Sequence, residues 1–196
     1  EDSFLILDLS ASDVDGDNLV FSASNDDSEI LVEGTTLTIT PPANYNGSDN
    51  VTVIVTDNSG LTDSAIFTLT VNPVNDPPSL DALSDTSVAE DGVYDLELSG
   101  ADVDGDTVTF LASVDGNGNV LVEGNILYVT PSADYNGDIT VTVIASDGQS
   151  SVSGSFILAV TPVNDAPVLS ALDAQTIDED SFLILDLSAS DVDGDN

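Results

Sequence analysis

Short aspartate-rich runs recur at regular intervals along the chain. The run Asp-Val-Asp-Gly-Asp occupies residues 13–17, 102–106 and 191–195, so each copy begins 89 residues after the previous one. Clustered carboxylates on a loop suit Ca²⁺, a hard cation that takes about six to eight oxygen ligands. We therefore expect calcium ligands at Asp13, Asp15, Asp17, Asp102, Asp104, Asp106, Asp191, Asp193 and Asp195.

Three further acidic elements repeat along the chain. Glu-Asp pairs stand at residues 1–2, 90–91 and 179–180, Asn-Asp pairs stand at 75–76 and 164–165, and a single aspartate precedes the last predicted strand of each repeat. These elements add Glu1, Asp2, Asp57, Asn75, Asp76, Glu90, Asp91, Asp147, Asn164 and Asp165 to the candidate calcium ligands.

The charge balance of the chain creates a need for cations. Its 196 residues include 37 acids and no Lys, Arg or His, which gives a formal net charge of −37. Repulsion among the carboxylates destabilises a compact state unless ions screen it or bind to it. Either high salt or divalent metal at specific sites would meet that need. Aspartate in tight loops favours specific calcium sites, because a merely solvated acidic surface would tolerate glutamate equally well.

The composition excludes several partners and chemistries. Nucleic acid and anionic membranes are not expected as partners, because the chain has no cation to meet phosphate. Zinc sites and disulfides are not expected without His and Cys. Membrane insertion is not expected, since no apolar run is long enough. An apolar content of 41% is too high for a disordered acidic tail.

The elements that must position the acids are short strands. In the second repeat, period-two alternation between turn residues predicts strands at 80–88, 92–98, 107–112, 120–122, 126–130, 139–146 and 153–160. Seven short strands at this spacing indicate an all-β, seven-stranded Greek-key sandwich of the Ig or cadherin-like kind. We expect a module over residues 1–74 that lacks its first strand, a complete module over 75–163, and the start of a third over 164–196. Residues 1–18 and 179–196 are identical, so the sequence also repeats at twice the module length.

Strand direction predicts where the acids meet. In an antiparallel sandwich, the Asp-Val-Asp-Gly-Asp loop and the loop of Asp57 or Asp147 lie at the incoming linker, and the Glu-Asp turn lies at the outgoing linker. The first predicted convergence comprises Glu1, Asp2, Asn75, Asp76, Asp102, Asp104, Asp106 and Asp147, and the second comprises Glu90, Asp91, Asn164, Asp165, Asp191, Asp193 and Asp195. So many carboxylates in one small region cannot all stay ionised without a metal.

Two further motifs have a structural and a functional interpretation. Tyr45 and Tyr135 each precede the sixth strand, where a packed ring with its hydroxyl bonded to backbone resembles a tyrosine corner. The alternative is a sugar-stacking aromatic. Asn46 and Asn50 lie in glycosylation sequons, which the second repeat lacks and which chance also produces in such a sequence.

The chain resembles the cadherin-like repeats of large bacterial calcium-dependent surface proteins and adhesins. The resemblance rests on the Val-Asn-Asp-x-Pro linkers, the Glu-Asp turns, the Asp-Val-Asp-Gly-Asp loops, and the loops Thr-Asp-Asn-Ser-Gly and Ser-Asp-Gly-Gln-Ser before the last strand. It implies several calcium ions at the junctions between modules, and an extracellular or cell-surface location. The linkers here are shorter than those of animal cadherins, which leaves the number of ions per junction open.

Three functional hypotheses follow. In the first, calcium at the junctions stiffens an extracellular stalk or fibre. In the second, identical modules of neighbouring chains associate through calcium, or through residues 166–178, which would supply the strand that the first module lacks. In the third, the modules themselves bind an adhesion ligand. An enzyme is not expected, because the acidic clusters recur in each repeat, as structural ligands would.

Overall fold

The protein is all-β, as the sequence predicts. A computed structural model describes residues 1–194, and every regular element in that part of the chain is a strand. The chain separates into two compact units. Unit 1 comprises Glu1–Pro77 and Asp102–Asp106, and unit 2 comprises Pro78–Ala101 and the chain from Thr107 onward. The loop Asp102–Asp106 therefore groups with unit 1, although in the sequence it belongs to the second repeat.

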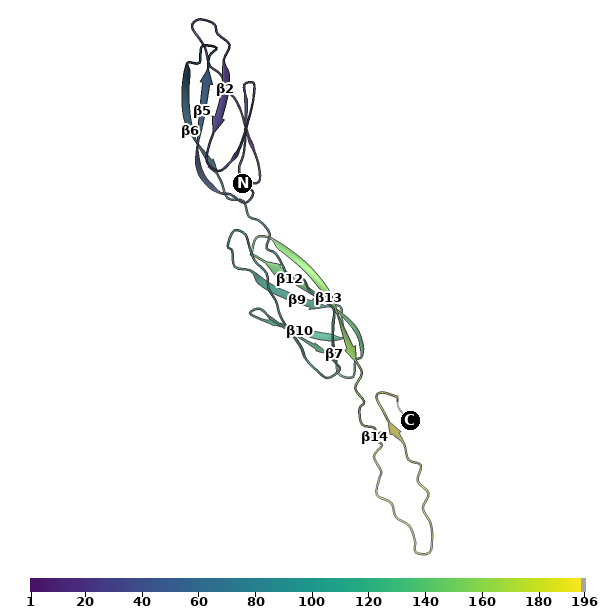
Figure 1. Ribbon diagram of the computed structural model, residues 1–196. Helices are drawn as coiled ribbons and strands as arrows, with labels where there is room; N and C mark the ends of the chain where they lie inside the picture. The colour runs from purple at the N-terminus through teal and green to yellow at the C-terminus, as the bar shows by residue number, and fades with distance from the viewer. Residues whose placement is uncertain (195–196) are drawn as a thin grey trace. The chain divides into compact units, whose positions relative to one another are not determined.

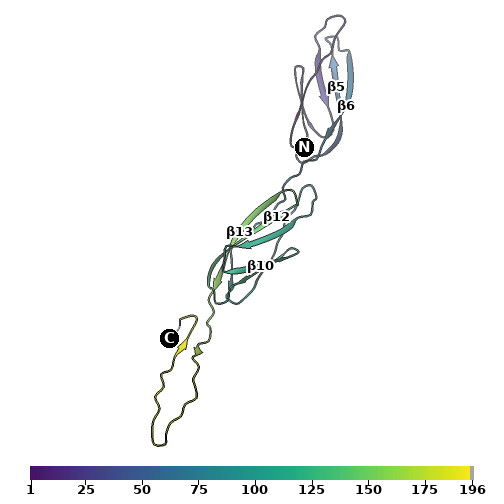
Figure 2. The ribbon, with the colours of Figure 1, turned by 180° about the vertical axis from the view of Figure 1, so that it is seen from behind.

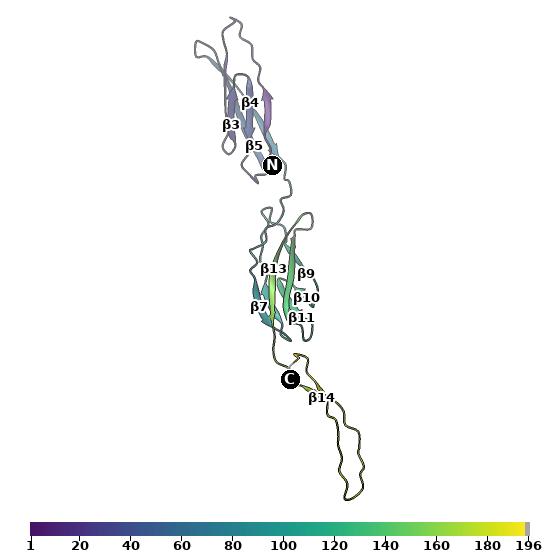
Figure 3. The same cartoon turned by 90° about the vertical axis from the view of Figure 1, so that its right-hand side faces the viewer.

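Unit 1 contains two antiparallel three-stranded sheets (Figures 1 and 3). Its strands are β1 (Leu5–Asp8), β2 (Val20–Ser24), β3 (Glu29–Glu33), β4 (Thr36–Thr40), β5 (Gly47–Thr56) and β6 (Thr62–Val71). The sheet orders are β1-β4-β3 and β2-β5-β6. Alternating side chains point inward, and Leu37, Ile39 and Val51 form the fully buried centre of the core.

Unit 2 contains the seven-stranded sandwich that the sequence predicts (Figures 1 and 2). Its strands are β7 (Thr86–Ala89), β8 (Tyr94–Glu97), β9 (Thr109–Val114), β10 (Gly118–Glu123), β11 (Ile126–Pro131), β12 (Gly137–Ser146) and β13 (Ser151–Thr161). One sheet has the order β10-β11-β8 and the other has the order β7-β13-β12-β9, with β7 parallel to β13. Beyond it, β14 (Val168–Leu169) pairs with β15 (Ala189–Ser190).

The first predicted strand of unit 2 is shorter than expected. Residues 80–85 are irregular and only Thr86–Ala89 form a strand. Leu80 and Leu83 nevertheless pack against the core. They lie over Gly154, where an added Cβ would stand 3.2 Å from Leu80 Cδ2 and 3.3 Å from Leu83 Cδ1. This close packing holds the segment in place together with backbone hydrogen bonds from Ser79 to Ala101 and from Asp81 to Ser99.

The tyrosine before β12 has the structural role that its position predicts. Tyr135 packs against the core of unit 2, and its hydroxyl donates a 2.9 Å hydrogen bond to the carbonyl of Asp138. Gly137 has φ 135°, and a Cβ there would lie 2.9 Å from the Tyr135 hydroxyl oxygen. The Tyr-Asn-Gly run therefore fixes the entry into β12 and the turn that precedes it. No helix within residues 1–194 is long and apolar enough to cross a bilayer.

Candidate metal centres

The aspartate-rich loops build their own turns. In each loop, Oδ1 of the first aspartate accepts backbone hydrogen bonds from residues further along the loop: Asp15 and Asp17 donate to Asp13, Asp104 and Asp106 donate to Asp102, and Asp193 donates to Asp191. The glycine of each loop has positive φ, between 77° and 83°. The loop conformation therefore uses only one oxygen of the first carboxylate.

The glutamate of each Glu-Asp turn is buried. Glu1 is 8% exposed and Glu90 is 3% exposed. Oε1 of Glu1 accepts a 3.0 Å hydrogen bond from the backbone of Val74, and Oε1 of Glu90 accepts a 2.5 Å bond from Val163. A buried carboxylate is costly unless hydrogen bonds or a cation compensate it. Each glutamate thus fixes the linker that follows the last strand of its repeat.

The backbone of each linker aspartate forms hydrogen bonds through both its nitrogen and its carbonyl oxygen. The backbone nitrogen of Asp76 donates a 2.8 Å hydrogen bond to Oδ2 of Asp104, and that of Asp165 donates a 2.6 Å bond to Oδ2 of Asp193. The amide of the preceding asparagine bonds to the aspartate's own carbonyl, at 2.9 Å for Asn75 and 2.7 Å for Asn164. The same linker geometry therefore recurs 89 residues later.

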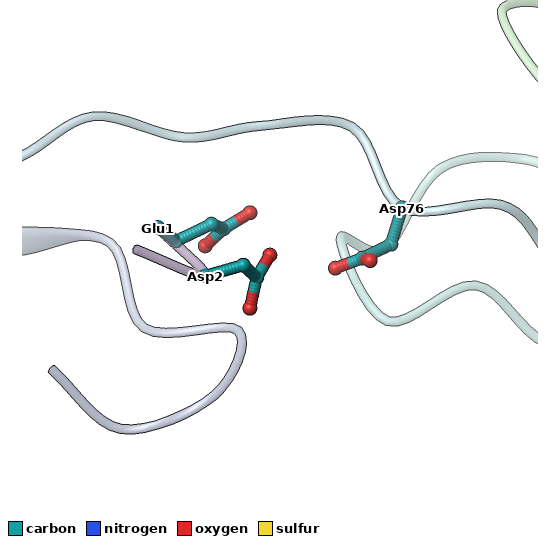
Figure 4. Close-up of side chains that lie close together, drawn as sticks. All are labelled: Glu1, Asp2 and Asp76. Carbon is teal, nitrogen blue, oxygen red and sulfur yellow. The ribbon is translucent and has the colours of Figure 1, made fainter. Parts of the chain in front are cut away.

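These elements bring carboxylates together at the end of unit 1. Glu1, Asp2 and Asp76 each offer an oxygen, and the three oxygens lie within 4.8 Å of one another. Figure 4 shows the three carboxylates facing a common space, two from the Glu-Asp turn and one from the linker. We call this group the first acidic cluster. Oε2 of Glu1 and Oδ2 of Asp76 are buried and have no hydrogen-bond partner.

The first acidic cluster is electrostatically unfavourable without a cation. Asp102 adds another buried oxygen without a partner, its Oδ2. Lost solvation, followed by the negative charges of Asp2, Asp104, Glu1 and Asp102, raises the pKa of the Asp76 carboxyl above its ordinary value. No lysine, arginine or histidine exists in the chain to offset this repulsion.

A second acidic cluster lies in unit 2, around Asp165. Two sets of three carboxylates meet the same 4.8 Å limit: Glu90 with Asp165 and Asp193, and Asp91 with Asp134 and Asp165. Asp165 belongs to both sets, and its Oδ2 is buried without a partner. Lost solvation, followed by the charges of Asp134, Asp193, Asp91 and Glu90, raises the pKa of the Asp165 carboxyl.

Sequence reasoning missed Asp134. It stands before the repeated Tyr-Asn-Gly run, at a position that is Asn44 in the first repeat. Because the acid appears in only one repeat, the search for repeated acidic residues did not find it. The usable signal was the pair Asn44 and Asp134 itself, since both residue types favour a left-handed backbone and both have it here, with φ 59° and 57°.

Other predicted ligands have different surroundings. Asp57 and Asp147 cap the turns that follow them: Oδ1 of Asp57 accepts from Ser59 and Leu61, and Oδ1 of Asp147 accepts from Gln149 and Ser150. Asp13 and Asp57 line one depression of unit 1, as strand direction predicts. Within residues 1–194, the compact sets of three carboxylates do not include Asp13, Asp15, Asp17, Asp57, Asp102, Asp104, Asp106, Asp147 or Asp191. Asp195 lies outside the described residues.

The donor set suits a hard divalent cation. Both clusters offer only oxygen atoms, and the oxygens come from a turn and a linker, with a loop aspartate beside them. Ca²⁺ accepts irregular sets of carboxylate, carbonyl and water oxygens, whereas Mg²⁺ requires near-octahedral order and retains most of its water. The residues present therefore fit calcium.

A family model identifies the kind of domain from which this chain is built. The sequence matches the model of a bacterial Ig domain over residues 1–70 and again over residues 75–158. The chain belongs to the bacterial Ig domain family. Its two bacterial Ig domains correspond to the first two repeats of the sequence. No curated protein matches the chain significantly.

Solved structures show which fold these bacterial Ig domains share. Human protocadherin-24 EC1-2 is 16% identical over 82% of this chain and 88% of its own, with a TM-score of 0.51. Drosophila N-cadherin EC1-3 is 12% identical over 77% of this chain and 57% of its own, with a TM-score of 0.40. An endo-fucoidan hydrolase of glycoside hydrolase family 107 is 21% identical over 83% of this chain, with a TM-score of 0.37, and the match spans only 26% of the hydrolase. The protocadherin similarity shows a cadherin-like fold and nothing about activity.

Proposed function

We propose that this chain is a structural repeat of an extracellular stalk or fibre, and that calcium at its acidic clusters rigidifies the array. The observation that supports this proposal is the first acidic cluster, in which Glu1, Asp2 and Asp76 each offer an oxygen within 4.8 Å of the others and Oε2 of Glu1 is buried without a hydrogen-bond partner. Membership of the bacterial Ig domain family supports the structural role. The resemblance to bacterial calcium-dependent adhesins extends it to a cell-surface or matrix protein.

Each cluster would act as a clamp on its linker. At the first cluster, Glu1, Asp2 and Asp76 would hold the ion, with Asp102 and Asp104 beside it. The ion would supply the positive charge that the chain lacks, so that the turn, the linker and the loop attract one common centre instead of repelling one another. Without calcium the same carboxylates repel, and the linker loses its fixed geometry. At the second cluster Glu90, Asp165 and Asp193 would hold the ion, with Asp91 and Asp134 beside it.

Calcium titration of the whole chain tests specific binding. Isothermal titration in a background of high NaCl should still show bound Ca²⁺, because screening by monovalent salt does not replace site-bound oxygen coordination. Asp76→Asn should weaken binding at the first cluster. The matched control is Asp27→Asn, which removes the same charge from an exposed loop position outside both clusters. Equal loss of binding in both variants, or full replacement of calcium by NaCl, would show simple charge screening instead.

Small-angle X-ray scattering tests the mechanical part of the proposal. The maximum dimension and its distribution should change when a chelator removes calcium, and should return when calcium is restored. Asp76→Asn should show the chelated behaviour at the first linker even in calcium. An unchanged scattering curve with and without chelator would refute stiffening, even if calcium binds.

The second candidate function is association between chains. In unit 2, β7 pairs with β13 over Leu158–Thr161. Within the described residues, β6 is an edge strand of its sheet, and the corresponding residues from Leu69 onward line an apolar depression together with Phe4, which is 62% exposed. Residues 175–178 of a second copy stand at the sequence position of β7 and would fit this edge.

Light scattering after size-exclusion chromatography tests this association. If residues 175–178 pair with β6 of another chain, the measured mass should rise with concentration in whole multiples of the chain mass. Ile177→Pro should abolish the rise, because proline removes a backbone donor and fixes φ. A constant single-chain mass at all concentrations would rule out this mode of assembly, and persistence of multiples in Ile177→Pro would assign them to another surface.

A further inference from the structure

Unit 1 has one sheet whose outer face carries no charge. In the sheet of β2, β5 and β6, Val51 and Phe67 belong to the core, so the residues that alternate with them point outward. Every second residue over 48–56 of β5 points outward, and these are Ser, Asn, Thr, Ile and Thr. The outward residues over 62–70 of β6 are Thr, Ser, Ile, Thr and Thr, and those over 20–24 of β2 are Val, Ser and Ser.

The sheet of β7, β13, β12 and β9 in unit 2 has nearly the same outer face. The outward residues over 151–161 of β13 are Ser, Ser, Ser, Ile, Ala and Thr. Those over 109–113 of β9 are Thr, Leu and Ser, and those of β7 are Ser and Ala. Those over 138–146 of β12 are Asp, Thr, Thr, Ile and Ser, so Asp138 is the one acid among the described outward positions. We call these outer faces, one in each unit, the neutral faces.

The other sheet of each unit carries acids on its outer face. The exposed residues of its strands include three acids in each unit: Asp8, Glu29 and Glu33 in unit 1, and Asp95, Glu97 and Glu123 in unit 2. Aspartate and glutamate are generally disfavoured in strands. Because the strands of these sheets nevertheless accept them, strand formation alone does not account for their absence from the neutral faces. Each unit therefore has one acidic and one neutral side.

Exposed apolar side chains lie at the centre of each neutral face. In unit 1, Val20 is 66% exposed and Ile66 is 67% exposed, and the strand register places them on one diagonal with the half-buried Ile54 between them. In unit 2, Leu111 is 68% exposed and pairs directly with Ile144 across β9 and β12. Directly paired and diagonal neighbours in a sheet are close enough for long side chains to touch. Each face thus offers a small apolar area flanked by hydroxyl groups.

We propose that the neutral faces pack against the neutral faces of a second copy of this chain, so that chains associate side by side with their acidic sheets outward. With 37 acids and no basic residue, two copies repel one another wherever their acids approach. The neutral faces are where this repulsion is weakest. Both repeats carry such a face, so a second copy offers a matching surface, as in a self-complementary two-fold contact. The inference does not depend on calcium, and it uses a sheet face rather than the edge of β6.

The size of the neutral faces predicts a weak contact that repetition strengthens. Sheets with small outward side chains can pack face to face at about 10 Å. With strands about 4.8 Å apart and a rise of about 3.3 Å per residue, each face covers about 400–500 Å². One pair of faces would bury about 800–1,000 Å² in total, which is the size of weak, transient contacts. A chain with several such faces would associate more tightly, because the first contact raises the effective concentration of the next.

Sedimentation velocity of the full chain tests the association. The mass should rise with protein concentration in whole multiples of the chain mass, and should rise further with NaCl, because salt screens the repulsion between copies. Ile66→Asp/Leu111→Asp should weaken the association by about tenfold or more, since each substitution places an unpaired charge at the centre of a contact. The matched control is Leu31→Asp/Leu121→Asp, on the acidic sheets, where the two leucines are 53% and 55% exposed. This control should associate as the unmodified chain does.

Spin labels locate the contact without adding a charge. The chain has no cysteine, so Thr52→Cys on the neutral face of unit 1 takes a single label. Its spectrum should show dipolar broadening at protein concentrations at which the chain associates. A label at Thr38→Cys, on the acidic sheet of the same unit, should show none. This comparison decides the question should the aspartate variants not fold, which circular dichroism reports.

Four outcomes would overturn the inference. The first is a constant single-chain mass at every protein and NaCl concentration. The second is an equal loss of association in the two double variants, or equal broadening from the two labels. The third is association that Ile177→Pro removes and Ile66→Asp/Leu111→Asp does not, which would assign it to the edge of β6. The fourth is a single chain that binds soluble dextran through these faces, which would make them a surface for neutral polysaccharide.

Discussion

The backbone nitrogen of Asp76 donates a 2.8 Å hydrogen bond to Oδ2 of Asp104. The donor belongs to the linker that follows the first repeat, and the acceptor belongs to the aspartate-rich loop of the second. The same bond recurs between Asp165 and Asp193 at 2.6 Å. Because the acceptor is a carboxylate, this bond fixes the linker and at the same time brings another negative charge to the acidic cluster.

Loss of that acceptor should loosen the linker. In Asp104→Ala the Asp76 amide has no acceptor, so its hydrogen exchange measured by NMR should accelerate, and unfolding free energy should fall by about 1 kcal/mol. Asp104→Asn retains an oxygen acceptor without the charge and serves as the matched control. Equal exchange rates in all three proteins would mean that the bond does not hold the linker in solution.

Removing the linker carboxylate should have opposite effects with and without calcium. In calcium-free buffer, Asp76→Asn should unfold at a higher denaturant concentration than the unmodified chain, because it relieves repulsion from its acidic neighbours. A ligand at about 100 times its dissociation constant stabilises the folded state by about 2.7 kcal/mol per site. At that calcium concentration, Asp76→Asn should lose the part of this stabilisation that comes from the first acidic cluster.

The reversal of sign distinguishes a metal ligand from an ordinary structural residue. Urea unfolding of both proteins, with chelator and with calcium, measures it directly. A variant that is less stable than the unmodified chain in both conditions would contradict the prediction, since the Asp76 side chain would then stabilise the fold without an ion.

Stability in the absence of calcium should depend on pH through the linker aspartates. The pKa values of Asp76 and Asp165 are raised in the folded protein, first by lost solvation and then by neighbouring carboxylates. The folded state therefore binds more protons than the unfolded state at pH values above the ordinary value of 3.8. Their contribution to stability should rise as pH falls through the raised values, and be complete below 3.8.

Calcium should change this pH dependence. Protons and calcium compete for the same carboxylates, so calcium affinity should fall as pH falls, and calcium-bound protein should lose stability over the window in which calcium-free protein gains it. Denaturant unfolding over that range in the two conditions provides the measurement. Parallel curves of stability against pH in the two conditions would show that Asp76 and Asp165, whose pKa values are raised, do not bind the ion.

The turn before β12 should be sensitive to a single methyl group. Gly137→Ala would place a Cβ 2.9 Å from the Tyr135 hydroxyl oxygen at φ 135°, so we expect a loss of about 2 kcal/mol or more in unfolding free energy. Gly116→Ala is the control, because Gly116 has a similar φ of 145° but open space at the Cβ position. It should cost less than Gly137→Ala, since only the backbone strain of about 1–3 kcal/mol remains. Equal losses would remove the tyrosine from the explanation.

The core of unit 2 should show the usual contrast between buried and exposed leucines. Leu158 is fully buried, and Leu158→Ala should lower unfolding free energy by about 2–5 kcal/mol. Leu111 is 68% exposed, and Leu111→Ala should change it by about 0.5 kcal/mol or less. Chemical denaturation followed by tyrosine fluorescence measures both. A small effect at Leu158 would mean that its neighbours refill the space.

The sequence alone predicted the all-β sandwich, because alternation between strand faces and turns is a local property. It predicted all seven strands of unit 2 and the recurrence of the acidic elements, since each repeat carries the same residues at the same spacing. It also predicted that the Glu-Asp turn and the linker aspartate meet, because the antiparallel order of strands fixes which loops share an end. The predicted strand over 80–88 was wrong for Leu80 and Leu83, because they pack over Gly154 in an irregular conformation that alternation cannot reveal.

Only the tertiary structure decided which acids face one another. Asp57 and Asp147 have the residue type of a ligand, and in the fold Oδ1 of each caps a turn, a use of aspartate that no local pattern reveals. Asp134 lacks an acidic counterpart in the first repeat, so periodicity passed over it, yet a left-handed turn brings it to Asp165. The burial of Glu1 and Glu90 was likewise invisible in sequence, because it depends on the backbone of Val74 and Val163 closing over each carboxylate. Long-range distance and burial are properties of the folded chain, and they determine which of its many carboxylates share a space that a cation could fill.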